Sequence, residues 1–254
     1  KFGILSYLLI TAVLGIGFMI FSDRSLNRVD KQRIGVIFIT AFFVIFFWSA
    51  FEQAGASLTF FAEEQTQRNL GWYTVPASFF QSLNSFFIII FAPIFAFLWV
   101  KLGNRGIEPS SPTKMALGLF LLALGYLVIA YGVKGIQPST KVSMMWLTSM
   151  YALHTYGELC LSPIGLSLVN KLSPLRFGSL LMAVWFLANA AANKMAGILS
   201  ALYPDPSKSA PHLLGFEITG LYQFFMLFVF MAGIASIILF TVTRYLQKMM
   251  HNGE

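Results

Sequence analysis

The residue in this sequence that most clearly could do chemistry is a carboxylate inside a long apolar stretch. Glu158 lies in the run HTYGELCLSPIGLS, with Pro163 close behind it. An ionisable side chain in such a stretch must pair with a cation, coordinate the ammonium of a ligand, or take up a proton. The alternative is a structural ion pair between helices. We interpret Glu158 as the leading candidate for a functional residue.

His154 precedes Glu158 by one helical turn, so the two side chains can share a helix face. The pair could relay a proton, although a single histidine in an apolar helix can also serve only as a hydrogen-bonding group between helices. A metal site is not expected, because this pair needs further ligands and Cys160 is the only cysteine. His154 is therefore a second candidate for proton coupling, and we expect no metal and no other cofactor.

Glu52 is a second carboxylate in apolar surroundings, in the run FFWSAFEQAGASL. Trp48 lies one turn before it, and the small residues at 54–57 follow it. Small residues let a second helix approach closely, as a gating contact requires, but they are also common in static packing. We predict a proton-linked or gating role for Glu52.

Three further residues are candidates only if they lie near these acids in the folded chain. Asn84, in QSLNSFF, could hydrogen-bond a ligand or a neighbouring helix. Ser162 lies one turn after Glu158, and Trp185 could form part of a cavity wall or simply pack between helices.

The elements that must position these residues are apolar helices. Of the 254 residues, 57% are hydrophobic and 11% are charged, which excludes a water-soluble globule. Seven stretches are long enough to cross a bilayer, and an open sheet edge in lipid would leave peptide groups unpaired, so all seven should be helices. They cover residues 4–21, 34–61, 72–100, 115–133, 142–169, 177–203 and 218–243. Pro76, Pro93 and Pro163 are the expected bend sites.

The basic residues indicate the orientation of these helices. Eleven lie in alternate connections and the carboxyl-terminal tail: Arg24, Arg28, Lys31, Arg33, Lys101, Arg105, Lys114, Lys171, Arg176, Arg244 and Lys248. The other connections hold Arg68, Lys134, Lys141 and Lys208. The positive-inside rule therefore predicts an outer N-terminus and a cytoplasmic C-terminus, and the net charge of +7 does not indicate nucleic-acid binding.

Four motifs together resemble a known family. FFWSAFEQAGASL, QSLNSFFIIIFAPIFA, GELCLSPIGLSLVNKLSP and MAVWFLANAAAN occur in that order. They resemble the C-terminal half of bacterial proton-coupled oligopeptide transporters, the POT family of the major facilitator superfamily. The resemblance implies an all-α membrane protein with a six-helix bundle over residues 34–254. Residues 1–33 would then form an extra lateral helix and a basic cytoplasmic linker.

The resemblance also implies roles for the candidate residues. Glu158 would face the amino terminus of a bound peptide, and Asn84 would hydrogen-bond its backbone. Trp185 and Trp48 would form walls of the cavity, which Ser162 would also line. Glu52 would be the proton-linked gate residue. The implied function is proton-coupled symport of di- and tripeptides by alternating access in the bacterial inner membrane, with protons as the coupling ion and no enzymatic activity.

The charged opening motif, the cavity lysine and the peptide-contacting tyrosines of the family's other half do not occur in this sequence. We therefore expect the chain to work with an N-terminal six-helix half, in a transporter roughly twice as long. Three alternatives stay open: a major facilitator carrier for another small solute, a passive scaffold, and a membrane-embedded enzyme that uses His154 and Glu158 as an acid–base pair.

Overall fold

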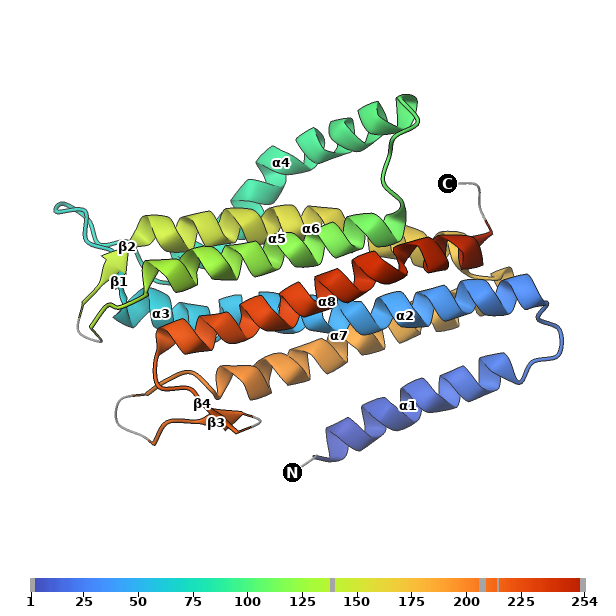
Figure 1. Cartoon of the computed structure of the whole chain (residues 1–254), viewed down its shortest axis with the longest axis horizontal. Helices are drawn as coiled ribbons and strands as arrows, with labels where there is room; N and C mark the ends of the chain where they lie inside the picture. The colour runs from blue at the N-terminus through green and yellow to red at the C-terminus, as the bar shows by residue number, and fades with distance from the viewer. Residues whose placement is uncertain (1–2, 138–139, 206–208, 214, 252–254) are drawn as a thin grey trace.

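The structure is a bundle of long helices that run roughly side by side (Figure 1). This computed structural model describes residues 3–137, 140–205, 209–213 and 215–251. Its long helices are α1 (Ile4–Phe21), α2 (Arg28–Phe51), α4 (Phe79–Asn104), α5 (Ser111–Gly132), α6 (Met144–Leu172), α7 (Gly178–Ser200) and α8 (Leu221–Met250). The all-α architecture predicted from the sequence is confirmed.

Short elements fill the connections between these helices. The 3-10 turn η1 (Glu52–Gly55) and helix α3 (Ser57–Glu64) continue the line of α2, and a second 3-10 turn, η2 (Leu175–Phe177), precedes α7. Strand β1 (Thr66–Gln67) pairs in parallel with β2 (Val142–Ser143), and β3 (His212–Leu213) pairs antiparallel with β4 (Phe216–Glu217). These pairs tie connections together at one end of the bundle (Figure 1).

Six segments in the described part of the chain are long and apolar enough to cross a membrane, so the protein is a multi-pass membrane protein. They are α1, the stretch from Arg28 to Glu64, α4, α5, the stretch from Leu175 to Ser200, and α8. The seventh long helix, α6, has 29 residues and is long enough by length alone. It is less apolar because it carries His154, Thr155 and Glu158.

Several predicted helix boundaries differ from the structure: the helix predicted over 34–61 begins at Arg28, and the one predicted over 218–243 covers Leu221–Met250. The helix predicted over 34–61 is interrupted at the 3-10 turn η1. The helix predicted to begin at Trp72 begins instead at Phe79, and Trp72 is 84% exposed in the preceding connection. Pro76 therefore precedes α4 and bends no helix, because the residue before a proline favours extended backbone. Pro93 and Pro163 do lie inside helices, in α4 and α6.

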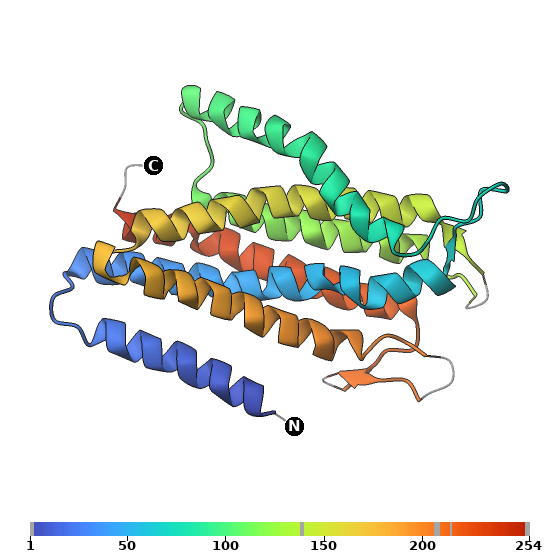
Figure 2. The ribbon, with the colours of Figure 1, turned by 180° about the vertical axis from the view of Figure 1, so that it is seen from behind.

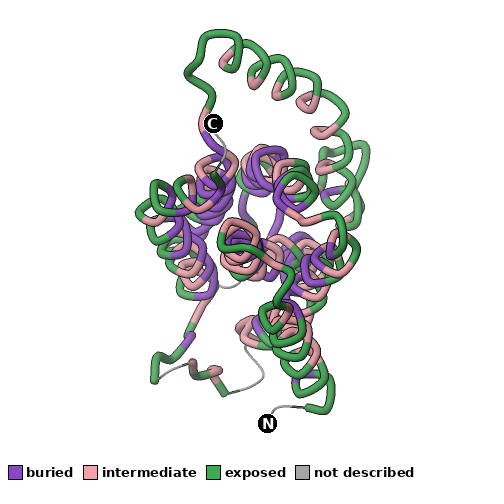
Figure 3. Tube along the Cα trace, turned by 90° about the vertical axis from the view of Figure 1, so that its right-hand side faces the viewer, coloured by how far each residue is buried: buried purple, intermediate pink, exposed green. Residues whose placement is uncertain are grey.

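The core lies where α5 packs against α6 and α8 and where α2 packs against α7 and α8. Figure 3 shows the buried residues gathered between these central helices. Gly118 of α5 and Gly157 of α6 let the two backbones approach closely, since a Cβ on either would lie 2.7 Å from the other's carbonyl oxygen. Large buried rings, including Phe47, Tyr126 and Phe228, fill the remaining space.

Two helices lie at the margins of this core. α1 lies along α7 on one side, and α4 contacts α6 on another (Figure 2). The carboxyl-terminal part of α4 stands away from the other helices, and α4 buries only Phe80. This exposed apolar surface is available to lipid or to further helices.

The connections are sorted between the two ends of the bundle. The α1–α2, α4–α5 and α6–α7 connections lie at the same end as the end of α8, and the four strands lie at the other (Figures 1 and 2). The eleven basic residues assigned to inner connections therefore gather at one end. Arg68, Lys134 and Lys141 belong to connections at the other end, and Lys208 lies outside the described residues.

Candidate functional site

One polar contact of the site joins α4 to α6. The Asn84 amide donates to Glu158 Oε2 at 2.8 Å and lies 3.2 Å from Thr155 Oγ1. Thr155 itself donates to the backbone carbonyl of Tyr151 at 2.8 Å, so its oxygen is fixed by its own helix. Asn84 and Glu158 are both half-buried. The carboxylate is therefore partly shielded from solvent and already held by one neutral donor.

Glu52 lies on η1, at the point where α2 ends, and its side chain is exposed. It is close enough to Glu158 for the two carboxyl groups to interact electrostatically. Neither acid forms an ion pair with any residue that the structure describes. The structural ion pair considered as the alternative for Glu158 is therefore not seen within the described chain, and both acids are available to cations from outside it.

The aromatic candidates differ in position. Trp48 is half-buried and packs edge-on against Phe47 and Phe51, with ring centroids 5.4 and 5.2 Å apart. Trp185 is only 2% exposed, and its indole lies directly over Gly165 of α6, where a Cβ would meet it at 2.2 Å. Trp48 is thus partly accessible, whereas Trp185 lies between α6 and α7. Ser162, one turn beyond Glu158, is half-buried.

His154 faces a different part of the bundle from the carboxylate that follows it. Its ring centroid lies 4.7 Å from that of Tyr126, and one ring nitrogen hydrogen-bonds the backbone of Leu122, both residues of α5. Nε2 is buried and has no hydrogen-bond partner among the described residues. No described contact joins His154 to Glu158, so the proton relay stays a prediction.

Two polar residues important to this region were given no role from the sequence, although Gln53 stands out there as a polar residue in an apolar helix. Tyr126 donates from its buried hydroxyl to the carbonyl of Ala50 at 2.6 Å, and Gln53 hydrogen-bonds α7. The available signal was that a hydroxyl or amide in an apolar helix must find a partner. That requirement says a partner exists but not which helix supplies it.

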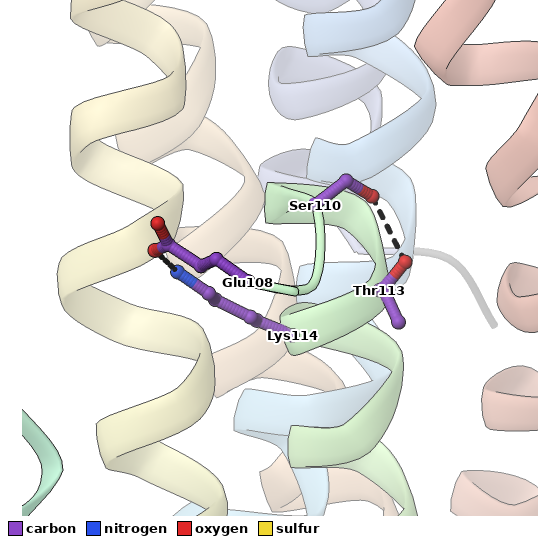
Figure 4. Close-up of polar contacts among 4 residues, drawn as sticks. All are labelled: Glu108, Ser110, Thr113 and Lys114. Carbon is purple, nitrogen blue, oxygen red and sulfur yellow. Dashed lines mark hydrogen bonds and ion pairs between the residues drawn. The ribbon is translucent and has the colours of Figure 1, made fainter. Parts of the chain in front are cut away.

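Lys114 is a third residue whose role the sequence interpretation missed, because it was counted only as a charge in a connection. It is 5% exposed, forms an ion pair with Glu108, and lies 4.6 Å from the ring centroid of Trp99. Figure 4 shows the Lys114 and Glu108 side chains meeting beside the start of α5, where Ser110 and Thr113 also hydrogen-bond each other.

The chemistry available to this site is that of two acids and an amide. The pair of Glu158 and Asn84 can bind an ammonium beside a hydrogen-bonding group, and Glu52 can gain or lose a proton at an exposed position. No group of three or more His, Cys, Asp or Glu residues that could hold a metal ion occurs among the described residues.

Comparison with known proteins places this arrangement in a family. The profile of the POT family (PTR2) matches residues 8–214. The chain is 39% identical over 182 residues to the peptide transporter YePEPT of Yersinia enterocolitica, which covers 71% of the chain and 36% of that protein. It is 31% identical over 214 residues to dipeptide and tripeptide permease A of Escherichia coli, covering 84% of the chain and 42% of the permease.

Solved structures give the same result. A crystal structure of peptide transporter POT in complex with sulfate matches with a TM-score of 0.82 at 29% identity, over 99% of this chain and 49% of that one. A POT family transporter in complex with a thioalcohol-conjugated peptide matches with a TM-score of 0.79 at 26% identity, over 97% of this chain and 49% of that one. The chain thus spans less than half the length of these relatives. These are transporters and not enzymes, and the chain belongs to the POT family.

Proposed function

We propose that this chain forms the C-terminal half of a proton-coupled symporter of di- and tripeptides that works by alternating access. The observation that carries the proposal is the half-buried Glu158 carboxylate, which is held by the neutral Asn84 amide at 2.8 Å and pairs with no cation among the described residues. The names of two relatives, a peptide transporter and a dipeptide and tripeptide permease, support peptides as the substrate class.

Peptide binding begins with the substrate's positive end. A zwitterionic peptide carries an ammonium, which pairs with Glu158 and compensates the cost of keeping that carboxylate away from water. Asn84 lies beside the same carboxylate and hydrogen-bonds the peptide backbone. Trp48, Trp185 and Ser162 contribute to the walls, so side chains of different sizes meet mainly apolar surface.

The peptide's negative end needs cations that the described face of this chain does not supply. We assign them to an N-terminal six-helix half that closes the cavity against α2, α4, α6 and α7. The large exposed surface of α4, which buries only Phe80, supports such a partner. Binding of one substrate by both halves then couples their relative movement.

Proton coupling is assigned to Glu52. Its exposed position on η1 lets it pair with a cation of the partner half when ionised and release that cation when protonated. Charge neutralisation would thereby loosen the closure on the outer side. His154 is a second candidate for this step.

The basic residues support an orientation in the bacterial inner membrane. The end of the bundle that holds the α1–α2 and α4–α5 connections would face the cytoplasm, together with the C-terminus (Figure 1).

The test is uptake of a labelled dipeptide into proteoliposomes that contain the complete two-half transporter. Wild type should accumulate the dipeptide when an inward proton gradient is imposed. Glu52→Gln should lose accumulation but keep exchange of peptide across the membrane, because exchange needs no net proton movement. Ser82→Ala, at an exposed position of α4, is the control and should behave as wild type. Full accumulation by Glu52→Gln would remove Glu52 from coupling, and failure of unlabelled di- and tripeptides to compete would favour a carrier of another solute.

A further inference from the structure

The helix that carries Glu52 is interrupted at that residue. α2 ends at Phe51, the 3-10 turn η1 covers Glu52–Gly55, and α3 begins at Ser57. Between them Ala56 has φ −131° and ψ −105°, outside the usual helical values. No proline lies in residues 48–60, and although Gly55 and Ser57 make the backbone here easier to bend, side chains from other helices also contact the interruption.

An interruption in a membrane helix leaves backbone carbonyls without their usual donors, and each needs a replacement. Tyr126 Oη donates to the carbonyl of Ala50 at 2.6 Å, and Thr59 Oγ1 donates to that of Ala54 at 2.8 Å. Gln53 Nε2 donates to the carbonyl of Ser49 at 3.1 Å. Three side chains therefore donate to carbonyls two or three residues from Glu52, and at Ala50 the Tyr126 hydroxyl adds to the backbone N–H of Glu52 itself.

Gln53 also fixes the turn to another helix. Its amide donates to the carbonyl of Ala196 in α7 at 3.0 Å, and its own oxygen accepts from Ser57 Oγ at 2.6 Å. Gln53 and Ser57 are both fully buried. The single side chain of Gln53 thus links the end of α2, the start of α3, and α7.

Tyr126 is itself held rigidly from behind. Its ring is fully buried and stacks on Phe228 of α8 with centroids 4.7 Å apart. On another side, the centroid of the Tyr126 ring lies 4.7 Å from that of His154. Gly125 leaves room for His154, since a Cβ on Gly125 would lie 2.5 Å from the imidazole ring. The Tyr126 hydroxyl that donates to the Ala50 carbonyl is therefore held in place by α5, α6 and α8, and not by α2.

We propose that Tyr126 and Gln53 are positioning residues for Glu52: they hold the interruption open and so keep its carboxylate exposed. The inference rests on the proposed role of Glu52 in coupling. The ionisable groups near the interruption are Glu158 of α6, Tyr126 of α5, and His154 and Tyr151 of α6, which both interact with Tyr126. Without these hydrogen bonds, α2 can continue as a regular helix and rotate Glu52 away from this position.

The first test separates coupling from transport. Tyr126→Phe keeps the ring stack and removes only the donor to Ala50. Tyr151→Phe is the matched control, because Tyr151 is also buried, at 3% exposure, and its hydroxyl makes no hydrogen bond described by the structure. In proteoliposomes of the complete transporter, Tyr126→Phe should reduce gradient-driven accumulation by about fivefold and leave exchange within about twofold. Equal accumulation by Tyr126→Phe and Tyr151→Phe would overturn the inference.

The second test does not depend on proton coupling. Gly55 is exposed and a Cβ there has no atom within 4 Å, so Gly55→Cys is a suitable reporter, while Cys160 is fully buried. Adding Tyr126→Phe or Gln53→Leu should change the rate of labelling by a membrane-impermeant maleimide by at least about threefold, and adding Tyr151→Phe should not. The same pattern is expected in a Glu52→Gln background.

The two tests distinguish the two proposals. An unchanged labelling rate in the Tyr126→Phe and Gln53→Leu variants overturns the positioning role, whatever Glu52 does. A second outcome is a changed labelling rate together with full gradient-driven accumulation by Glu52→Gln. This outcome keeps the structural role of Tyr126 and Gln53. It rejects the proposed function of Glu52, and therefore also the role of Tyr126 and Gln53 in coupling.

Discussion

Asn84 of α4 donates a hydrogen bond of 2.8 Å to Glu158 of α6. The two residues lie on helices separated by all of α5 in the sequence, and α4 has its main contacts with α6. The bond therefore does two things at once. It gives a half-buried carboxylate one hydrogen-bond donor, and it fixes the N-terminal part of a helix that otherwise buries almost nothing.

Loss of the Asn84 donor should weaken peptide binding. Asn84→Leu removes a hydrogen bond to a charged group, which typically contributes about 1.5–3 kcal/mol, so the KM for a dipeptide in exchange assays should rise at least about tenfold. The adjacent exposed Ser85→Ala serves as the control and should leave KM unchanged. A KM for Asn84→Leu equal to that of wild type would show that the amide only joins two helices.

The close approach of α5 and α6 predicts a stability effect. Gly157→Ala places a Cβ 2.7 Å from the Gly118 carbonyl oxygen, so the helices must separate, at a cost of about 1–3 kcal/mol. Gly197→Ala on α7 meets nothing within 4 Å and should be neutral or slightly stabilising. Thermal unfolding in detergent measures both. A Gly157→Ala variant as stable as Gly197→Ala would mean that the two backbones do not touch.

Removing one or the other partner of the ion pair between Lys114 and Glu108 should have unequal effects on stability (Figure 4). The Lys114 side chain is 6% exposed and that of Glu108 is 41% exposed. Glu108→Gln leaves a buried ammonium without its counter-charge, whereas Lys114→Met leaves a carboxylate that water can reach. Glu108→Gln should therefore destabilise the protein by about 1–3 kcal/mol and Lys114→Met by less. The opposite order in thermal unfolding would contradict the assigned burial.

The α1–α2 connection provides a prediction about pH. Hydrogen bonds from the hydroxyl and backbone amide of Ser25 hold the pKa of the Asp23 carboxyl below its ordinary value of 3.8, and Arg176 lies 3.0 Å from it. A lowered pKa in the folded chain means that the stabilisation is complete above the ordinary value and is lost only as pH falls through the lowered one. Asp23→Asn should therefore speed amide hydrogen exchange in residues 22–28 by about two- to fivefold, equally at pH 7 and pH 5. An effect that is present at pH 7 and gone at pH 5 would contradict this.

The sequence was informative where a single residue departs from its surroundings. Glu158 and Glu52 stand out because a charge in an apolar run is costly wherever its helix packs. The same reasoning found the long helices, since each needs only its own residues to satisfy its backbone.

Properties that depend on a second helix could not be predicted. Gln53 was visible as a polar residue, but its link to Ala196 depends on how α2 and α7 pack. Lys114 resembled a loop charge because its partners, Glu108 and Trp99, come from the preceding connection and helix. The start of α4 was misplaced because Trp72 is apolar and yet lies in an exposed connection, a position that composition alone does not distinguish from a helix.

The central claim is that Glu158 binds the amino terminus of the peptide. Its most direct test compares inhibition of exchange by a dipeptide and by the same dipeptide with an acetylated amino terminus, in wild type and in Glu158→Gln. Wild type should prefer the free amine by at least about tenfold, and Glu158→Gln should bind the two compounds within about twofold of each other. An undiminished preference for the free amine in Glu158→Gln would contradict the claim.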